Sequence, residues 1–195
     1  MGSNFLIAYP GVLAILLVFA VLVWNEKNYL FKMDGNTIDR ITYTSAPFPE
    51  SVVIGKYIRE HTSSNDKIAV LGSEPQIYFY AQRQAATGFV YTYEMMRDHP
   101  YAHHFQVQMV NEIEAAKPKF IVSINVPGSW YSTALDHVDS TLFNWEQQYL
   151  SNNYRQVGLV SIPWPEKNEG IYCWSPPEQV CKSEYSNSVA IYKRN

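Results

Sequence analysis

The sequence predicts an α/β fold, in which one transmembrane helix precedes a Rossmann-like, mostly parallel sheet of about five strands with helices on both faces. Two observations lead to this prediction. The 15 basic and 18 acidic residues all lie at or after Glu26, so the chain begins with an uncharged apolar segment. After residue 50, short β-branched runs alternate with amphipathic helical patterns. A helix that connects two parallel strands must cross back over the sheet, so this alternation favours a largely parallel sheet.

The apolar segment at the start of the chain is long enough to span a bilayer. Phe5–Trp24 contains 20 residues without a charge, and a helix of that length is about 30 Å long. Trp24 and Tyr29 are placed as interfacial anchors at its end. A buried core helix and a cleavable signal peptide are alternatives, although no basic residue precedes the apolar run and no A-x-A motif follows it. The predicted domains are a transmembrane helix within residues 1–31, a linker over 32–49 and a soluble α/β domain over 50–195.

The soluble part shows a regular succession of helical and strand patterns. Val53, Ile54 and Tyr57 fall at helical spacing, whereas Lys67–Gly72 (KIAVLG) is short and β-branched, as in a buried strand. Pro118 ends the longest helical pattern. We expect helices over 51–62, 73–83, 100–117 and 140–153, and strands over 67–72, 86–91, 120–125, 154–162 and 189–193, of which the last two pair antiparallel.

Three loops follow the carboxyl ends of predicted strands, where open α/β sheets bind their ligands. They begin after Leu71, Tyr91 and Asn125. We expect polar contacts to a ligand from these loops and from an arginine at the end of the second helix. The candidate ligand-binding residues are Ser73, Glu74, Gln76, Arg83, Tyr91, Asn125, Ser129 and Trp130.

The same residues have structural interpretations. Glu74 suits the first turn of a helix, whose dipole favours a carboxylate, and Arg83 suits an ion pair. The turn after Leu71 has one glycine instead of G-x-G-x-x-G, so we expect no dinucleotide cofactor. His99 and His103 are four residues apart but have no third ligand at motif spacing, so we expect no metal. No serine of these loops lies in a G-x-S-x-G motif, and no catalytic residue is predicted.

Charge and cysteine content constrain partners and compartment. The net charge of −3 offers no basic face, so nucleic-acid binding is not expected. Cys173 and Cys181 lie close together in a Pro-rich loop and are either two free thiols or a disulfide. A disulfide would stabilise the domain by roughly 2–3 kcal/mol and would require an oxidising compartment. Lys27 and Lys32, which follow the apolar segment, weakly favour a cytoplasmic domain instead.

One stretch of the chain resembles a known family. The run DKIAVLGSEPQIYFYAQRQAATGFVYTYEMM, followed by EIEAAKPKFIVSINVPGSW, is similar to the soluble C-terminal domain of bacterial integral-membrane glycosyltransferases of the GT-C class, relatives of the dolichyl-phosphate-mannose protein mannosyltransferases. The resemblance covers roughly residues 50–162, and its most specific part is Gly72–Arg83 (GSEPQIYFYAQR). It implies a domain that follows the last transmembrane helix, lies at the bacterial inner membrane and faces the periplasm.

The resemblance also implies a function for the chain. In this class the donor is a polyprenyl-phosphate-linked sugar, and the catalytic carboxylate lies between early membrane helices that have no counterpart in this sequence. We therefore expect an accessory, non-catalytic domain that meets the bilayer, the sugar donor and the acceptor as part of a full-length enzyme. The alternatives are a stand-alone membrane-anchored Rossmann-like binding or interaction module and a self-sufficient α/β enzyme that uses the loops after Gly72 and Asn125.

Overall fold

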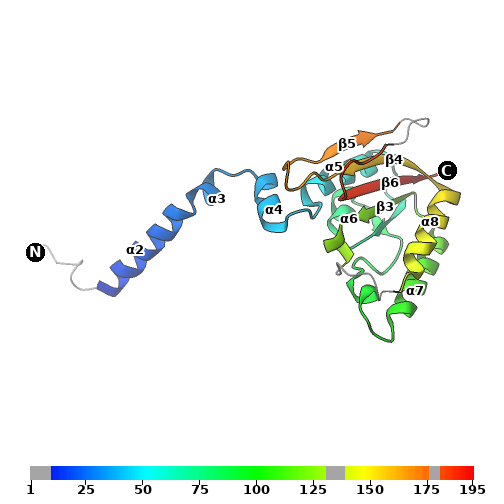
Figure 1. Ribbon diagram of the computed structural model, residues 1–195, viewed down its shortest axis with the longest axis horizontal. Helices are drawn as coiled ribbons and strands as arrows, with labels where there is room; N and C mark the ends of the chain where they lie inside the picture. The colour runs from blue at the N-terminus through cyan, green and yellow to red at the C-terminus, as the bar shows by residue number, and fades with distance from the viewer. Residues whose placement is uncertain (1–9, 131–138, 176–180) are drawn as a thin grey trace, which may run out of the picture.

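The structure is a computed structural model that describes residues 10–130, 139–175 and 181–195. An α/β body is built on a six-stranded mixed sheet, and a helical arm at the N-terminal side leads into it (Figure 1). The helices are α2 (Pro10–Asn25), α3 (Lys27–Phe31), α4 (Gly35–Tyr43), α5 (Phe48–Glu60), α6 (Gln76–Ala81), α7 (Ala102–Ala116) and α8 (Thr141–Asn153), with short 3₁₀ turns η1 (Tyr93–Met96) and η2 (Pro127–Trp130). The strands are β1 (Lys67–Leu71), β2 (Gln84–Ala85), β3 (Phe120–Asn125), β4 (Tyr154–Ser161), β5 (Ile171–Trp174) and β6 (Ser188–Arg194).

The α/β class is confirmed, but the prediction of a mostly parallel sheet of about five strands is wrong. The strand order is β2-β1-β3-β6-β4-β5, and only β1–β2 and β1–β3 are parallel pairs among the described strands. The last strand, β6, inserts between β3 and β4 and is antiparallel to both. Strands β3 and β4 therefore run in the same direction, as a crossover through α8 requires, although they are not neighbours. The predicted antiparallel pairing of the last two strands is confirmed.

Two strands differ from the predictions, and the first differs for a local reason. The predicted strand over 86–91 is absent, because only Gln84 and Ala85 pair with β1. Immediately afterwards, the Glu112 carboxylate accepts hydrogen bonds from the Thr87 hydroxyl (2.7 Å) and the Gly88 N–H (2.8 Å), which turns the chain away from the sheet towards α7. Strand β5 was not predicted; it adds four residues to the outer edge of β4 inside the long loop that holds the cysteines.

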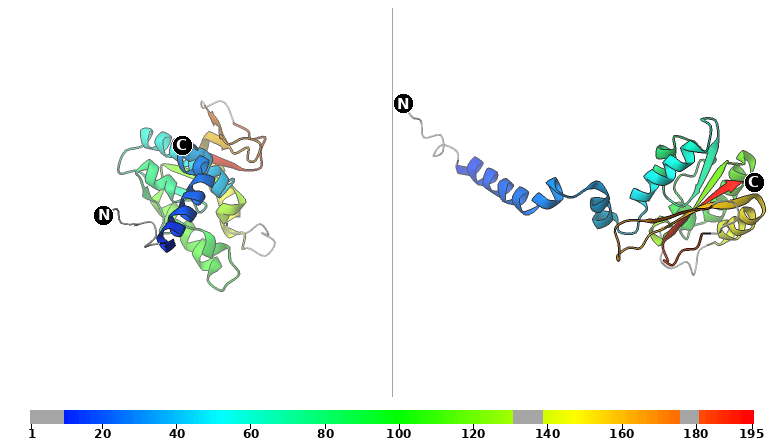
Figure 2. Two further views of the ribbon diagram at one scale, coloured as in Figure 1. Left: turned by 90° about the vertical axis from the view of Figure 1, so that its left-hand side faces the viewer. Right: turned by 90° about the horizontal axis from the view of Figure 1, so that it is seen from above.

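Helices cover both faces of the sheet (Figure 2). Because side chains alternate along a strand, Ile68 and Val70 pack on one face against α5 and α6, whereas Ala69 and Leu71 pack on the other against α7 and α8. Helices α5 and α6 approach closely at Gly55, where an added Cβ would lie 2.8 Å from the α6 backbone. These contacts fix the ends of β1 and β3 relative to the surrounding helices.

The segment predicted as a linker contains α4 and is docked on the body. The side chain of Asp34 caps α4 by accepting a hydrogen bond from the Thr37 N–H at 3.1 Å. Arg40 in the last turn of α4 is only 1% exposed and forms an ion pair with Glu50, which is fully buried. The Arg40 guanidinium also donates to the Asn168 carbonyl at 2.9 Å, so it ties α4 to the loop before β5.

Helix α2 lies in the segment predicted to span a membrane. It contains 16 residues and buries none of them, and the side chains of Leu17 and Phe19 are 68% and 64% exposed. In the part of the chain that the structure describes, no helix combines the length and apolar character needed to cross a membrane. Residues 5–9, with which the predicted spanning helix begins, lie outside the described residues.

Candidate functional site

The three loops predicted to form a site meet at the carboxyl ends of β1 and β3. Ser73 donates its backbone N–H to the Ser129 hydroxyl at 2.8 Å, and its own hydroxyl lies 3.0 Å from that of Thr92. The Thr92 N–H donates back to the Ser73 hydroxyl at 3.1 Å. Gly72 permits this meeting, because its φ of +139° is unfavourable for other residues and an added Cβ would lie 2.7 Å from the Ser129 hydroxyl. Residues 72–74, 92 and 129 are called the loop cluster below.

Glu74 places a carboxylate inside the loop cluster. It is only 5% exposed, and the Gln76 side-chain amide donates a hydrogen bond to it. Burial raises the pKa of Glu74 above its ordinary value, while hydrogen bonds from Gln76 and Ser129 act in the opposite direction. The salt bridges formed by the described residues do not include Glu74. The arrangement therefore holds an acidic group that can accept a hydrogen bond from a ligand hydroxyl.

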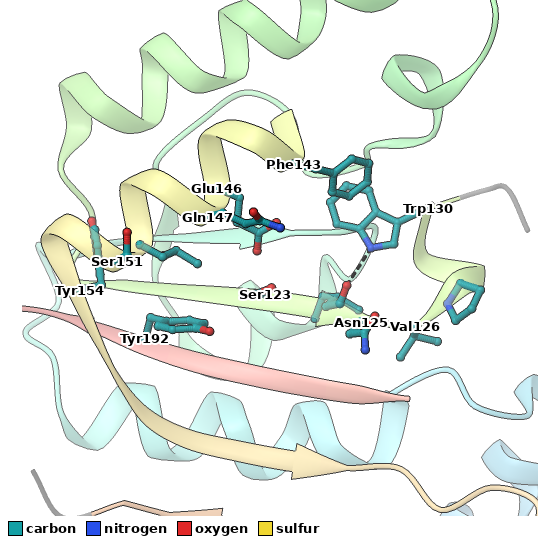
Figure 3. A pocket seen from close by; sticks show the side chains of 13 residues that line it. Ser123, Asn125, Val126, Trp130, Phe143, Glu146, Gln147, Ser151, Tyr154 and Tyr192 are labelled. Carbon is teal, nitrogen blue, oxygen red and sulfur yellow. Dashed lines mark hydrogen bonds between the residues drawn. The ribbon is translucent and has the colours of Figure 1, made fainter. Parts of the chain in front are cut away.

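A cavity of about 700 Å³ opens beside the loop cluster, between α8 and the sheet (Figure 3). Trp130, the residue after Ser129, forms part of its wall, and its indole N–H donates to the Ile124 carbonyl at 2.7 Å. The Phe143 ring from α8 packs 4.8 Å from the Trp130 ring, measured between centroids. Volumes of roughly 300–1,000 Å³ are typical of small-molecule sites. We call this cavity the α8 pocket.

The α8 pocket contains an acidic side chain of its own, Glu146, in addition to Glu74 of the loop cluster. Glu146 projects from α8 towards Ser123 of β3 and Tyr192 of β6 (Figure 3). Burial raises the pKa of Glu146, whereas a hydrogen bond with Ser123 lowers it. Burial also raises the pKa of Tyr192, and the nearby negative charge of Glu146 adds to that effect. The pocket therefore combines one carboxylate with aromatic rings and with the hydroxyl groups of Ser123, Ser151, Tyr154 and Tyr192.

The structure brings together only some of the predicted site residues. Ser73, Glu74, Gln76 and Ser129 lie in or beside the loop cluster, and Trp130 connects it to the α8 pocket. Asn125 also lines the pocket, although its side-chain amide donates to the Ser186 carbonyl at 2.8 Å.

The predicted site residues Tyr91 and Arg83 do not line the α8 pocket. Tyr91 is an exposed residue whose ring lies 5.7 Å from that of Tyr93. Arg83 lies at the opposite end of the parallel strands, next to the first residue of β2. Its guanidinium donates to the Thr62 hydroxyl (2.8 Å) and to the Arg59 carbonyl (3.0 Å), which closes the end of α5. The contacts of Arg83 are therefore structural.

Other residues of these two features were not predicted. Glu146 could have been found, because it lies four residues from both Leu142 and Leu150 on the buried stripe of α8. Thr92 and Tyr192 gave no comparable pattern, since their contacts depend on how distant segments pack. His99 and His103, at which no metal was expected, do not line the α8 pocket; His103 lies 2.6 Å from the Asp139 carboxylate. Within the described ranges, no group of three or more metal-ligating side chains comes together.

The fold and these two adjoining features define an α/β domain with a ligand-sized pocket between α8 and the sheet, which reaches the carboxyl end of β3. Comparisons with protein-family models, curated proteins and solved structures find no match for the chain.

Proposed function

We propose that this chain is the accessory extracytoplasmic domain of an integral-membrane glycosyltransferase that uses a polyprenyl-phosphate-linked sugar. In this proposal, α2 and the preceding apolar residues anchor the domain in the bacterial inner membrane, and the α/β body faces the periplasm. The body contacts the sugar or the acceptor within the full-length enzyme and does not catalyse transfer by itself. The similarity of Gly72–Arg83 to membrane glycosyltransferases of the GT-C class supports the enzyme class.

The exposed apolar surface of α2 is the main support for the proposed membrane anchor. The helix has no charged residue, and none of its apolar side chains is buried by the described part of the chain. Leaving such side chains in water is unfavourable by about 25 cal/mol per Å² of apolar surface. Together with Phe5–Tyr9, the apolar run reaches 20 residues, which matches the thickness of a bilayer core. Lipid is therefore the occupant that fits this helix.

Side chains at the end of α2 support a membrane boundary there. The Lys27 ammonium lies 3.9 Å from the centroid of the Trp24 ring. Tryptophan and lysine commonly mark the level of the lipid head groups, where a ring is half immersed and an ammonium reaches water. The body begins after this point, with α4 docked on it through Arg40.

The disulfide supports the outward orientation. Cys173 and Cys181 are bonded across an eight-residue separation, with a Cα–Cα distance of 6.0 Å. Such bonds persist in oxidising compartments such as the periplasm and are rare in the cytosol. We give this observation more weight than the two lysines after α2, because few charges decide little about orientation.

Flotation with lipid vesicles tests the anchor. The full chain is expected to float with vesicles of phosphatidylethanolamine and phosphatidylglycerol and to resist extraction at alkaline pH. Leu16→Asp with Leu17→Asp should abolish flotation, because carboxylates are costly in hydrocarbon. Val52→Asp with Phe79→Asp, which changes exposed apolar residues of the body, should leave it unchanged. A full chain that stays with the soluble fraction, or equal flotation of the two variants, contradicts the anchor.

Two further observations test the enzyme class. The full chain alone should transfer no sugar from a labelled polyprenyl-phosphate mannose, whereas transfer by this chain alone would refute the accessory role. The coding sequence before residue 1 should encode several more apolar segments of about 20 residues. A start codon at residue 1 without such neighbours would instead favour the stand-alone anchored binding module.

A further inference from the structure

The α8 pocket has two ends of different character (Figure 3). Trp130 and Phe143 form an aromatic wall at the end near η2, and Tyr154 with Ser151 lies at the other end. Between them, Glu146 from α8 faces the sheet. The Tyr154 hydroxyl donates to the Pro118 carbonyl at 2.8 Å, so its ring is fixed in place. The pocket is therefore elongated, with polar groups distributed along it between rigid apolar surfaces.

The charge of the lining excludes an anionic ligand. Glu146 is the one charged side chain among the 13 lining residues, and no lysine or arginine is among them. A phosphate or carboxylate would enter a partly desolvated site next to a negative charge, without a cation to compensate. A phosphate group of a lipid-linked donor therefore does not belong in this pocket.

The positions of the rings argue against a compact organic cation. Ammonium groups are usually held by several aromatic faces that surround one point. Here the Trp130 and Phe143 rings pack on each other at one end, while Tyr154 occupies the opposite end. A pyranose ring suits this arrangement better, because its C–H face packs on an aromatic ring while its hydroxyls bond along its edge. Carboxylate, amide and hydroxyl groups can satisfy those hydroxyls.

We propose that the α8 pocket binds a neutral saccharide of one or two pyranose units, with Glu146 accepting hydrogen bonds from sugar hydroxyls and the aromatic wall of Trp130 and Phe143 packing against a ring face. The pocket volume of about 700 Å³ lies within the range of roughly 300–1,000 Å³ for small-molecule sites. The inference deepens the proposed function, because it names the sugar part as the group that the body recognises. It depends on the pocket and not on the membrane anchor, so flotation and sugar binding can fail separately.

Saturation-transfer NMR on the full chain in detergent tests the inference. The probes are methyl α-D-mannopyranoside, methyl α-D-glucopyranoside, methyl α-D-galactopyranoside and maltose. At least one of them should receive saturation from the protein and bind with a measurable dissociation constant. Glu146→Gln should weaken that binding about tenfold, because hydrogen bonds to a charged group are stronger than those to an amide. Methyl α-D-mannopyranoside 6-phosphate should bind more weakly than the neutral sugar.

Two neighbouring glutamines of α8 provide a matched pair of variants. Gln147 lines the pocket and Gln148 does not, and both are exposed. Gln147→Trp should fill the pocket and abolish the saturation transfer, whereas Gln148→Trp should bind like the unmodified chain. Equal circular dichroism spectra show that both variants are folded.

Three results would overturn the inference. The first is a folded chain that binds none of the four neutral probes. The second is sugar binding that survives Gln147→Trp, which would place the saccharide elsewhere. The third is binding of glucosamine, as its ammonium form, at least tenfold more tightly than of the neutral pyranosides, which would identify a cation site.

Discussion

Replacing Arg40 by methionine is expected to destabilise the protein strongly. Arg40 and Glu50 are 1% and 0% exposed, so the variant leaves a buried carboxylate without its counter-charge. It also removes the donors for the carbonyl groups of Asn168, Thr44 and Ala46. Removing one partner of a buried ion pair typically lowers the free energy of unfolding by about 3–5 kcal/mol. For a protein of this size, that corresponds to a decrease in Tm of about 10 °C.

Urea unfolding followed by tryptophan fluorescence measures the effect. Arg59→Met is the control, since Arg59 is exposed on α5 and a surface change usually alters stability by less than about 0.5 kcal/mol. The double variant Arg40→Met with Glu50→Leu should be more stable than Arg40→Met alone, because it buries no unpaired charge. In the native structure, Glu50 Oε2 is the buried side-chain atom of the described residues without a hydrogen-bond partner. Equal unfolding free energies for Arg40→Met and Arg59→Met would refute this reasoning.

Three further predictions concern stability. Burial raises the pKa of Glu74 from its ordinary value of 4.5, so the stability that this group contributes is complete below pH 4.5 and is lost as the pH rises through the raised pKa. Urea unfolding between pH 4 and pH 8 should therefore show a smaller loss of stability for Glu74→Gln than for the unmodified chain; parallel profiles would contradict it. Reducing the Cys173–Cys181 disulfide should lower the free energy of unfolding by about 2–3 kcal/mol, and an unchanged urea midpoint after reduction would argue against it. Gly55→Ala should lower that free energy by about 1–3 kcal/mol, because the new Cβ would lie 2.8 Å from the α6 backbone. Gly35→Ala, which meets nothing within 4 Å, is the control in thermal melting, and equal Tm values would disprove the close contact.

The helices that pack on the sheet and most strands were predictable because their patterns are local, whereas α4 was predicted as a linker. Residues 120–125 form a short β-branched run that becomes β3 with the same bounds, and Pro118 ends the helical pattern before it. The position of β6 could not be predicted in this way. Its pairing with β3 and β4 depends on which distant segments fit side by side, and β-branched residues at alternating positions suit an edge or a centre equally.

The candidate site was predictable to a similar extent. The rule that ligands bind beyond the carboxyl ends of strands led to Ser73, Glu74 and Ser129, which do meet in the structure. Arg83 was chosen for its place at the end of a predicted helix, and nothing in the sequence shows that its guanidinium turns towards the end of α5. Glu146 belongs to a helix rather than to a loop, so a search restricted to loops missed it.

The central place of β6 has a consequence for biogenesis. This strand leaves the ribosome last of the six, yet it bridges β3 and β4, so the growing polypeptide carries two incomplete half-sheets until synthesis has passed residue 194. Each half exposes an unpaired edge that invites aggregation. We expect the sheet to close only after β6 has been synthesised and has paired with β3 and β4.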